Sequence, residues 1–122
     1  MTETLSISPD ETYIRVHSSG SPSLDEMQQT LAEILELSHE YGINAVLVDS
    51  RGRSGQPPLT DIYSGGETLA ETLGSQIRVA VLVKKLLDDH TFFENVAVNR
   101  GADLAYFEDE DAALSWLLQD ES

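Results

Sequence analysis

The sequence contains no cysteine and only seven basic residues against 22 acidic ones, in a chain of 122 residues. Without cysteine there is no disulfide framework, no thiolate zinc site and no cysteine nucleophile. The formal net charge of −15 leaves no basic footprint of the kind that nucleic acids and anionic membranes require. We therefore expect neither nucleic acid nor a membrane surface among the partners.

Long apolar runs and a leader segment are missing as well. No run of apolar residues approaches the roughly 20 that a membrane-spanning helix needs. The N-terminus, Met1-Thr2-Glu3-Thr4, has neither the basic nor the apolar segment of a secretory signal. These absences predict a cytoplasmic protein. The length fits one domain over residues 1–122, which can bury a core without disulfides.

The sequence does contain an alternation of strand and helix patterns. Residues 4–8 and 13–17 alternate between apolar and polar side chains across a short turn, which predicts a β-hairpin. Continuous apolar runs predict buried strands, and apolar residues at helical spacing predict helices. After the hairpin, the expected strands are residues 45–49, 77–83 and 104–107, and the expected helices are residues 24–40, 59–73, 89–100 and a last one after Asp109.

The order of these elements predicts an α/β fold. Strand–helix–strand crossovers make successive strands parallel and are nearly always right-handed. We expect a mostly parallel sheet of about five strands, with an N-terminal β-hairpin and four helices. The connecting residues 18–22 and 50–58 are expected to form loops.

Some details inside the helices are also predicted. Ser23 and Glu26 have the spacing of a capping box at the start of the first helix. Gly65 and Gly66 lie inside the second helix and predict either a close approach to the sheet or a kink. The apolar spacing also marks residues on the inward sides of the helices, among them Leu35, Leu59, Phe92 and Phe93.

A candidate binding site lies beyond the carboxyl ends of the strands, where open α/β sheets hold their ligands. Four of the seven basic residues are expected at this edge. Arginine offers paired donors to carboxylates and phosphates, and the start of the second helix adds free backbone N–H groups. We therefore predict an anion or partner site, called the rim below, made of Ser50, Arg51, Arg53, Ser54, Thr60, Lys84 and Lys85. The alternative is that polar loops carry these charges without binding anything.

Motifs for catalysis, cofactors and metals are missing. The chain has no phosphate-binding P-loop, no dinucleotide fingerprint, no paired-histidine zinc motif and no nucleophile elbow. His90 and Glu94 are spaced to share one helix face, with Asp88 nearby, but a solvated helix start explains them better than a metal site. We expect no cofactor, no metal and no enzymatic activity.

Several stretches resemble the SpoIIAA-like family of STAS-type proteins. Residues 92–101, Phe-Phe-Glu-Asn-Val-Ala-Val-Asn-Arg-Gly, are similar to that family's FFE-x-VA-x-NRG segment. Residues 46–49 and 107–117 also look like the family, and with the helix from Leu24 the resemblance covers nearly the whole chain. It implies a right-handed β/α superhelix of four turns, shared by anti-sigma-factor antagonists and by CRAL-TRIO lipid-binding domains.

The resemblance departs from the antagonists at their phosphorylation site. There, a phosphorylatable serine in a D-S-S-G turn opens the second helix. The corresponding residues here are 56–61, Gln-Pro-Pro-Leu-Thr-Asp, so that motif is missing. Thr60 is the nearest hydroxyl by position and Ser54 lies earlier in the loop, which makes these two the candidate phosphorylation sites.

Two functions remain open on the sequence. The first is a non-enzymatic STAS-like module, with a regulatory role, that binds a protein partner or a small anionic ligand through the rim. The alternative is a lipid or other small-molecule binding protein of the CRAL-TRIO kind. That alternative needs an apolar cavity of several hundred Å³, so a cavity distinguishes the two.

The two central strands also predict self-association. Residues 45–48 and 77–83 are apolar on both sides, so both faces of the sheet need cover. Successive crossovers between neighbouring strands put most helices on one face, and the last helix is expected to reach only part of the other. Because large exposed apolar patches are unusual on a monomer, we expect a two-fold homodimer through that face.

Overall fold

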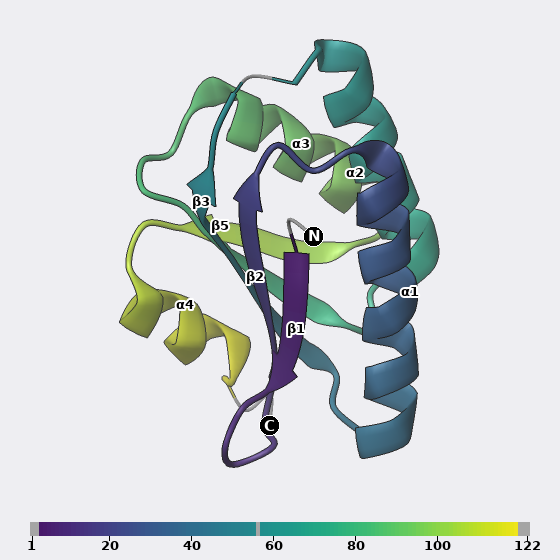
Figure 1. Ribbon diagram of the computed structural model, residues 1–122, viewed down its shortest axis with the longest axis vertical. Helices are drawn as coiled ribbons and strands as arrows, with labels where there is room; N and C mark the ends of the chain where they lie inside the picture. Colours follow the sequence, from purple (N-terminus) through teal and green to yellow (C-terminus); the bar gives the residue numbers. More distant parts are fainter. Residues whose placement is uncertain (1–2, 56, 120–122) are drawn as a thin grey trace.

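The N-terminal hairpin and the strands that follow it form one five-stranded sheet, in the order β1-β2-β3-β4-β5 (Figure 1). The computed structural model describes residues 3–55 and 57–119. The strands are β1 (Glu3–Ile7), β2 (Ile14–Gly20), β3 (Ala45–Arg53), β4 (Arg78–Leu82) and β5 (Asp103–Phe107), and the helices are α1 (Leu24–Tyr41), α2 (Leu59–Leu73), α3 (Asp88–Asn99) and α4 (Glu110–Leu117).

The predicted α/β fold is confirmed. β1 and β2 pair antiparallel, and β2, β3, β4 and β5 pair parallel to one another. The register sets four apolar residues side by side across the sheet, all of them buried: Ile14, Val46, Val79 and Leu104. The central strands carry unbroken apolar runs because alternate residues of β3 and β4 are buried in clusters on opposite faces of the sheet.

The ends of α1 follow the sequence signals. The Ser23 hydroxyl accepts a hydrogen bond from the Glu26 backbone N–H at 3.2 Å, and the Glu26 carboxylate accepts one from the Ser23 N–H at 3.4 Å. Gly42 ends the helix in the left-handed conformation, with a φ angle of 68°. No helix within the described residues has the length and apolar character needed to cross a membrane.

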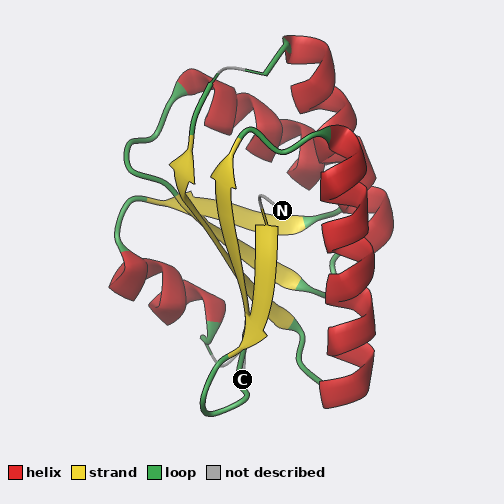
Figure 2. Ribbon diagram, viewed as in Figure 1, coloured by secondary structure: helices red, strands yellow, loops and turns green. Residues whose placement is uncertain are grey.

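Helices cover both faces of the sheet (Figure 2). On one face, α1, α2 and α3 bury a core with residues such as Leu31, Leu69 and Ala97. On the other face, Ala113 and Leu117 of α4 complete a second buried cluster with β3 and β4. α4 covers more of this face than the sequence predicts. The exposed apolar face on which the predicted homodimer depended is therefore covered within one chain.

Two strands are longer than predicted. Residues 18–20 belong to β2 and residues 50–53 belong to β3, although both stretches read as polar loops. The two extensions pair with each other, because Ser19 lies opposite Gly52 and Gly20 lies opposite Arg53. Backbone pairing with a neighbouring strand does not require apolar side chains, so a polar composition concealed these extensions.

Three helix residues expected to face inward are exposed. Leu59 is 63% exposed, Leu35 is 40% exposed and Phe92 is 37% exposed. Leu59 begins α2, and the next two residues of the helix are exposed as well. In α3, Phe93 takes the inward position instead, and its ring meets that of Tyr106 edge to face.

The paired glycines of α2 mark a close approach between helices, not between helix and sheet. A Cβ on Gly65 would lie 3.1 Å from the Phe93 ring of α3 and 3.3 Å from the Met27 sulfur of α1. A Cβ on Gly66 would lie 2.9 Å from a Val96 methyl group. Because Gly65 and Gly66 have no side chains, α2 packs closely against α1 and α3.

The new methyl group of Gly66→Ala overlaps Val96, which costs about 1–3 kcal/mol. Alanine gains roughly 1 kcal/mol in helix propensity, so we expect a net destabilisation of up to about 2 kcal/mol. Urea unfolding measures the change. In a Val96→Ala background the same substitution should cost less, since the overlapping methyl groups are gone. An equal cost in both backgrounds would contradict this packing.

Candidate functional site

A β-bulge separates the two arginines of the predicted rim. The register of β2 and β3 shifts after Asp49, so that Ser50 and Arg51 together lie opposite Ser18. An extra residue of this kind reverses the side of the sheet to which later side chains point. As a result, Arg51 makes its contacts on the face covered by α4, whereas Arg53 makes its contacts on the face covered by α1.

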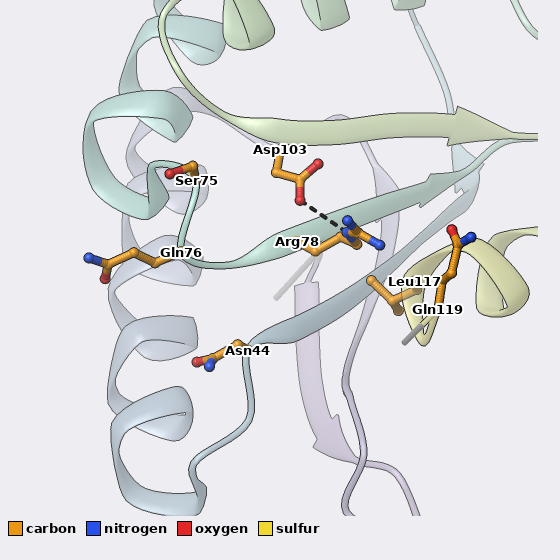
Figure 3. Close-up of a pocket in the computed structure, with 7 residues that line it drawn as sticks. All are labelled: Asn44, Ser75, Gln76, Arg78, Asp103, Leu117 and Gln119. Atoms are coloured by element: carbon orange, nitrogen blue, oxygen red, sulfur yellow. Dashed lines mark hydrogen bonds and ion pairs between the residues drawn. The ribbon is translucent and has the colours of Figure 1, made fainter. Parts of the chain in front are cut away.

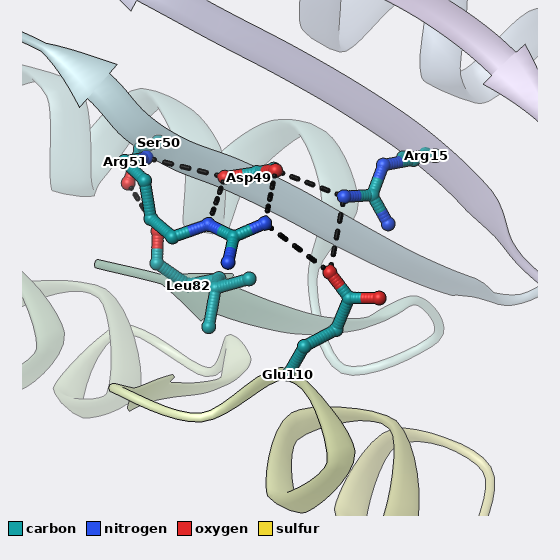
Figure 4. A network of polar contacts seen from close by, with 6 residues as sticks. All are labelled: Arg15, Asp49, Ser50, Arg51, Leu82 and Glu110. Carbon is teal, nitrogen blue, oxygen red and sulfur yellow. Dashed lines mark hydrogen bonds and ion pairs between the residues drawn. The ribbon is translucent and has the colours of Figure 1, made fainter. Parts of the chain in front are cut away.

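Arg51 is bound within a four-residue ionic network (Figure 4). Its Nε donates to one oxygen of Asp49 at 2.9 Å, and its Nη2 donates to the other oxygen, also at 2.9 Å. Arg15 of β2 donates to that second oxygen at 2.8 Å. Glu110 of α4 accepts from both guanidinium groups, at 3.1 Å from Arg15 and 3.3 Å from Arg51. The network thus ties α4 to the two strands beneath it.

Asp49 is the buried centre of this network, with a side chain only 6% exposed. The hydrogen bond from Arg51 lowers the pKa of Asp49 to about 2, against the opposing effect of burial. Neighbouring Ser50 is also buried, and its hydroxyl donates to the Leu82 carbonyl at 2.8 Å. The side chains of Asp49 and Ser50 therefore both form contacts that hold β3 in the sheet.

Arg53 is held on the opposite face by a second set of contacts. Its Nε donates to the Ser18 hydroxyl at 2.7 Å, and its Nη2 pairs with the buried Glu3 carboxylate at 3.0 Å. The other oxygen of Glu3 accepts a hydrogen bond from Thr30 of α1 at 2.6 Å. Arg53 therefore links β3 to β1 and, through Glu3, to α1.

The rim predicted from the sequence does not come together as one anion site. Arg51 and Arg53 were expected to supply its donors, but their guanidinium groups pair with carboxylates of the protein itself, on opposite faces of the sheet. Ser50 is buried, while Ser54 and Thr60 are exposed. Gln56, at the start of the stretch compared with the phosphorylation turn, lies outside the described residues.

Lys84 and Lys85 are exposed and are the charged rim residues that form no ion pair within the described part of the chain. All five arginines of the chain form ion pairs with carboxylates: Arg15, Arg51, Arg53, Arg78 and Arg100. Neither lysine makes a hydrogen bond or ion pair with any residue in the part of the chain that the structure describes. In a protein with a net charge of −15, these two lysines can therefore meet a partner without first giving up an ion pair within the described residues.

The two lysines begin an exposed segment that leads from β4 into α3, called the 84–89 segment below. Leu86 and Leu87 follow them and are 48% and 49% exposed. Asp88, exposed, and Asp89, half-buried, then begin α3. The segment therefore exposes two consecutive leucines, with two lysines before them and two aspartates after them. Its surface combines an apolar centre with charged ends of opposite sign.

The 84–89 segment is fastened at several points. Just before it, the Val83 N–H donates to the Phe107 carbonyl at 2.9 Å. The Leu86 N–H donates to the Glu108 carboxylate at 2.7 Å, and the Leu87 N–H donates to Nδ1 of His90 at 3.0 Å. The backbone N–H groups of Leu86 and Leu87 are therefore hydrogen-bonded while the leucine side chains remain in solvent.

His90 and Glu94 have structural roles at the start of α3. The His90 ring stacks on Tyr106, with 5.0 Å between ring centroids, and burial lowers the pKa of His90. The Glu94 carboxylate accepts a hydrogen bond from the Tyr106 backbone N–H at 3.2 Å. Within residues 3–55 and 57–119, no group of three or more acidic or histidine side chains could hold a metal ion.

A pocket of about 250 Å³ lies at the end of the sheet opposite the rim, where β3, β4 and β5 begin (Figure 3). Most of its lining is polar: Asn44, Ser75, Gln76, Arg78, Asp103, Leu117 and Gln119. Arg78 is engaged there by an ion pair with Asp103 at 3.0 Å and by a cation–π contact with Trp116. The lining does not offer the apolar walls that a lipid chain requires.

This arrangement is similar to that of a known protein structure. An uncharacterised protein of the DUF3478 family from Shewanella loihica PV-4, solved with a SpoIIAA-like fold, matches at a TM-score of 0.57 and 25% sequence identity. The match covers 94% of this chain and 91% of that one. The chain has the SpoIIAA-like fold. No protein-family model matches the sequence, and no curated protein matches it significantly.

The SpoIIAA-like fold confirms the resemblance seen in the sequence, but a shared fold does not assign a function. Function has to be argued from surface chemistry. The rim predicted from the sequence includes Lys84 and Lys85 but not the four residues that follow them. The sequence does contain a pattern that could have identified these residues, namely two leucines between two lysines and two aspartates.

The Asp49 network predicts a specific sensitivity to acid. Because the pKa of Asp49 is lower in the folded protein than its usual 3.8, its contribution to stability is complete above that value and is lost as the pH falls toward 2. The shift corresponds to roughly 2 kcal/mol. We expect Asp49→Asn to be less stable at pH 6, with a deficit that shrinks by about this amount toward pH 2.5.

Urea unfolding of the two proteins between pH 6 and pH 2.5 measures this difference. Glu36→Gln, a change at an exposed carboxylate of α1, is the control and should follow the wild type. Parallel pH profiles for wild type and Asp49→Asn would show that Asp49 carries no such contribution.

Proposed function

We propose that the protein is a non-enzymatic, cytoplasmic binding module that docks a protein partner through the 84–89 segment. One observation carries this proposal. The two unpaired lysines of a strongly acidic chain stand directly beside two exposed leucines, whose backbone N–H groups are hydrogen-bonded to Glu108 and His90. The expected regulatory role would follow from what is docked there.

The leucines favour a protein partner. Single exposed apolar side chains are common on protein surfaces, but adjacent ones on a rigid turn keep apolar area in water that a partner can bury. Because Glu108 and His90 already fix the Leu86 and Leu87 backbone, docking orders less chain than it would on a mobile loop. Pre-organisation of this kind lowers the entropic cost of binding.

The charges around the segment disfavour a small anion as the ligand. Asp88 and Asp89 follow within the same segment, and the Glu108 carboxylate already takes the Leu86 N–H. A phosphate bound to this segment would therefore share it with the Asp88 and Asp89 carboxylates. A protein partner can place acidic groups against the lysines and basic groups against the aspartates.

The lipid-binding alternative gains no support from the described pocket. An apolar ligand needs an enclosed cavity lined by apolar side chains. The pocket of Figure 3 is instead lined largely by amide, hydroxyl and charged groups. The buried faces of the sheet are filled by the side chains of the helices.

Affinity capture with paired variants tests the proposed function. Wild type and Leu86→Ser/Leu87→Ser, each tagged, are compared for the proteins they retain from a native extract, this chain included. Leu35→Ser/Val98→Ser is the matched control, because it removes two exposed apolar side chains elsewhere. We expect a partner that wild type and control retain at similar levels and that the segment variant loses by at least tenfold. Identical partners for all three would contradict the proposal.

A further inference from the structure

The 84–89 segment is complementary to itself when reversed. Its order is two lysines, two leucines and two aspartates. When this order is reversed, the leucines remain in the middle. The positions of the lysines are then taken by aspartates, and those of the aspartates by lysines. A two-fold axis brings two copies of a surface together in this reversed sense, because residue i of one copy meets residue j of the other and the converse also holds.

We propose that the partner docked on the 84–89 segment is a second copy of this chain, related by a two-fold axis that passes between Leu86 and Leu87. This inference rests on the proposed function and names its partner. Antiparallel docking sets Lys84 and Lys85 of each copy against the aspartates of the other, with the four leucines at the centre. Within the segment, each pair of like charges then faces a pair of opposite sign.

The size of the surface implies a weak dimer. Stable interfaces bury roughly 1,200–2,000 Å² in total, and one six-residue segment per copy supplies less than that. Phe92 lies one helical turn beyond Asp88 and is 37% exposed, so it extends the apolar area along α3. A dissociation constant of about 10 μM to 1 mM is the appropriate range for such a contact.

The net charge of each copy opposes association but does not forbid it. Two chains of −15 repel at long range, and 0.15 M salt screens such repulsion beyond about 8 Å. The lysine–aspartate pairs act at contact distance, where screening is smaller. This dimer differs from the one predicted through the sheet face, because α4 already covers that face.

Charge exchange within the segment tests the two-fold arrangement. The first variant, Lys84→Asp/Lys85→Asp, makes every charge in the segment negative. The second, Asp88→Lys/Asp89→Lys, makes every charge positive. The third combines all four changes and so reverses the order of the charges. Sedimentation equilibrium of the full chain at 20 μM to 1 mM in 0.15 M salt measures association, and thermal unfolding confirms that each variant is folded.

We expect the wild type to dimerise within that range. The first two variants should each bind themselves at least tenfold more weakly, and a mixture of the two should form heterodimers. The fourfold variant should dimerise as the wild type does, which a general effect of charge or of helix stability cannot explain. Leu86→Ser/Leu87→Ser should remain monomeric.

The results separate this inference from the proposed function. A wild type that stays monomeric at 1 mM overturns the inference, as does a fourfold variant that remains monomeric while folded. The proposed function survives either result if affinity capture still yields a different protein that depends on the segment. It fails if the segment variants alter neither self-association nor capture.

Discussion

One buried carboxylate, that of Asp49, ties together the elements on the second face of the sheet. The central strands are apolar on both faces, so the sheet needs cover on each, and α4 alone supplies it on the second face. Asp49 holds two guanidinium groups in the orientation that also binds Glu110 at the start of α4. The helix is thus fixed by apolar contacts along its length and by ion pairs at its first turn. Removing the carboxylate would leave two neighbouring positive charges facing a single acidic partner.

Much of the fold could be predicted from the sequence, because its elements depend on local patterns. The bounds of α2 and the capping box at Ser23 and Glu26 were predicted as the structure has them, since both rest on residues close in the chain. The candidate site was harder. The partners of Arg51 and Arg53 lie on other strands and helices, and the bulge that turns these arginines to opposite faces has no clear signal in the sequence.

The difference between arginine and lysine in this protein accounts for its available surface. Arginine, with its rigid fork of donors, suits buried and partly buried ion pairs, and here every arginine makes one. Lysine is strongly hydrated and stays in solvent more readily. The two lysines adjoin one another, and beside them stand leucines that the core does not use. The proposed binding surface therefore consists of side chains that neither the ion pairs nor the hydrophobic core of the protein uses.

The central claim is that the 84–89 segment of one chain binds the same segment of a second copy. The most direct measurement is the concentration dependence of backbone amide NMR signals from the isotope-labelled, full-length protein between 20 μM and 1 mM. The account predicts shifts that grow with concentration and are concentrated in the 84–89 segment and around Phe92, with little change on the exposed face of α1. Signals that do not move with concentration, or that move mainly on α1 or α4, would contradict it.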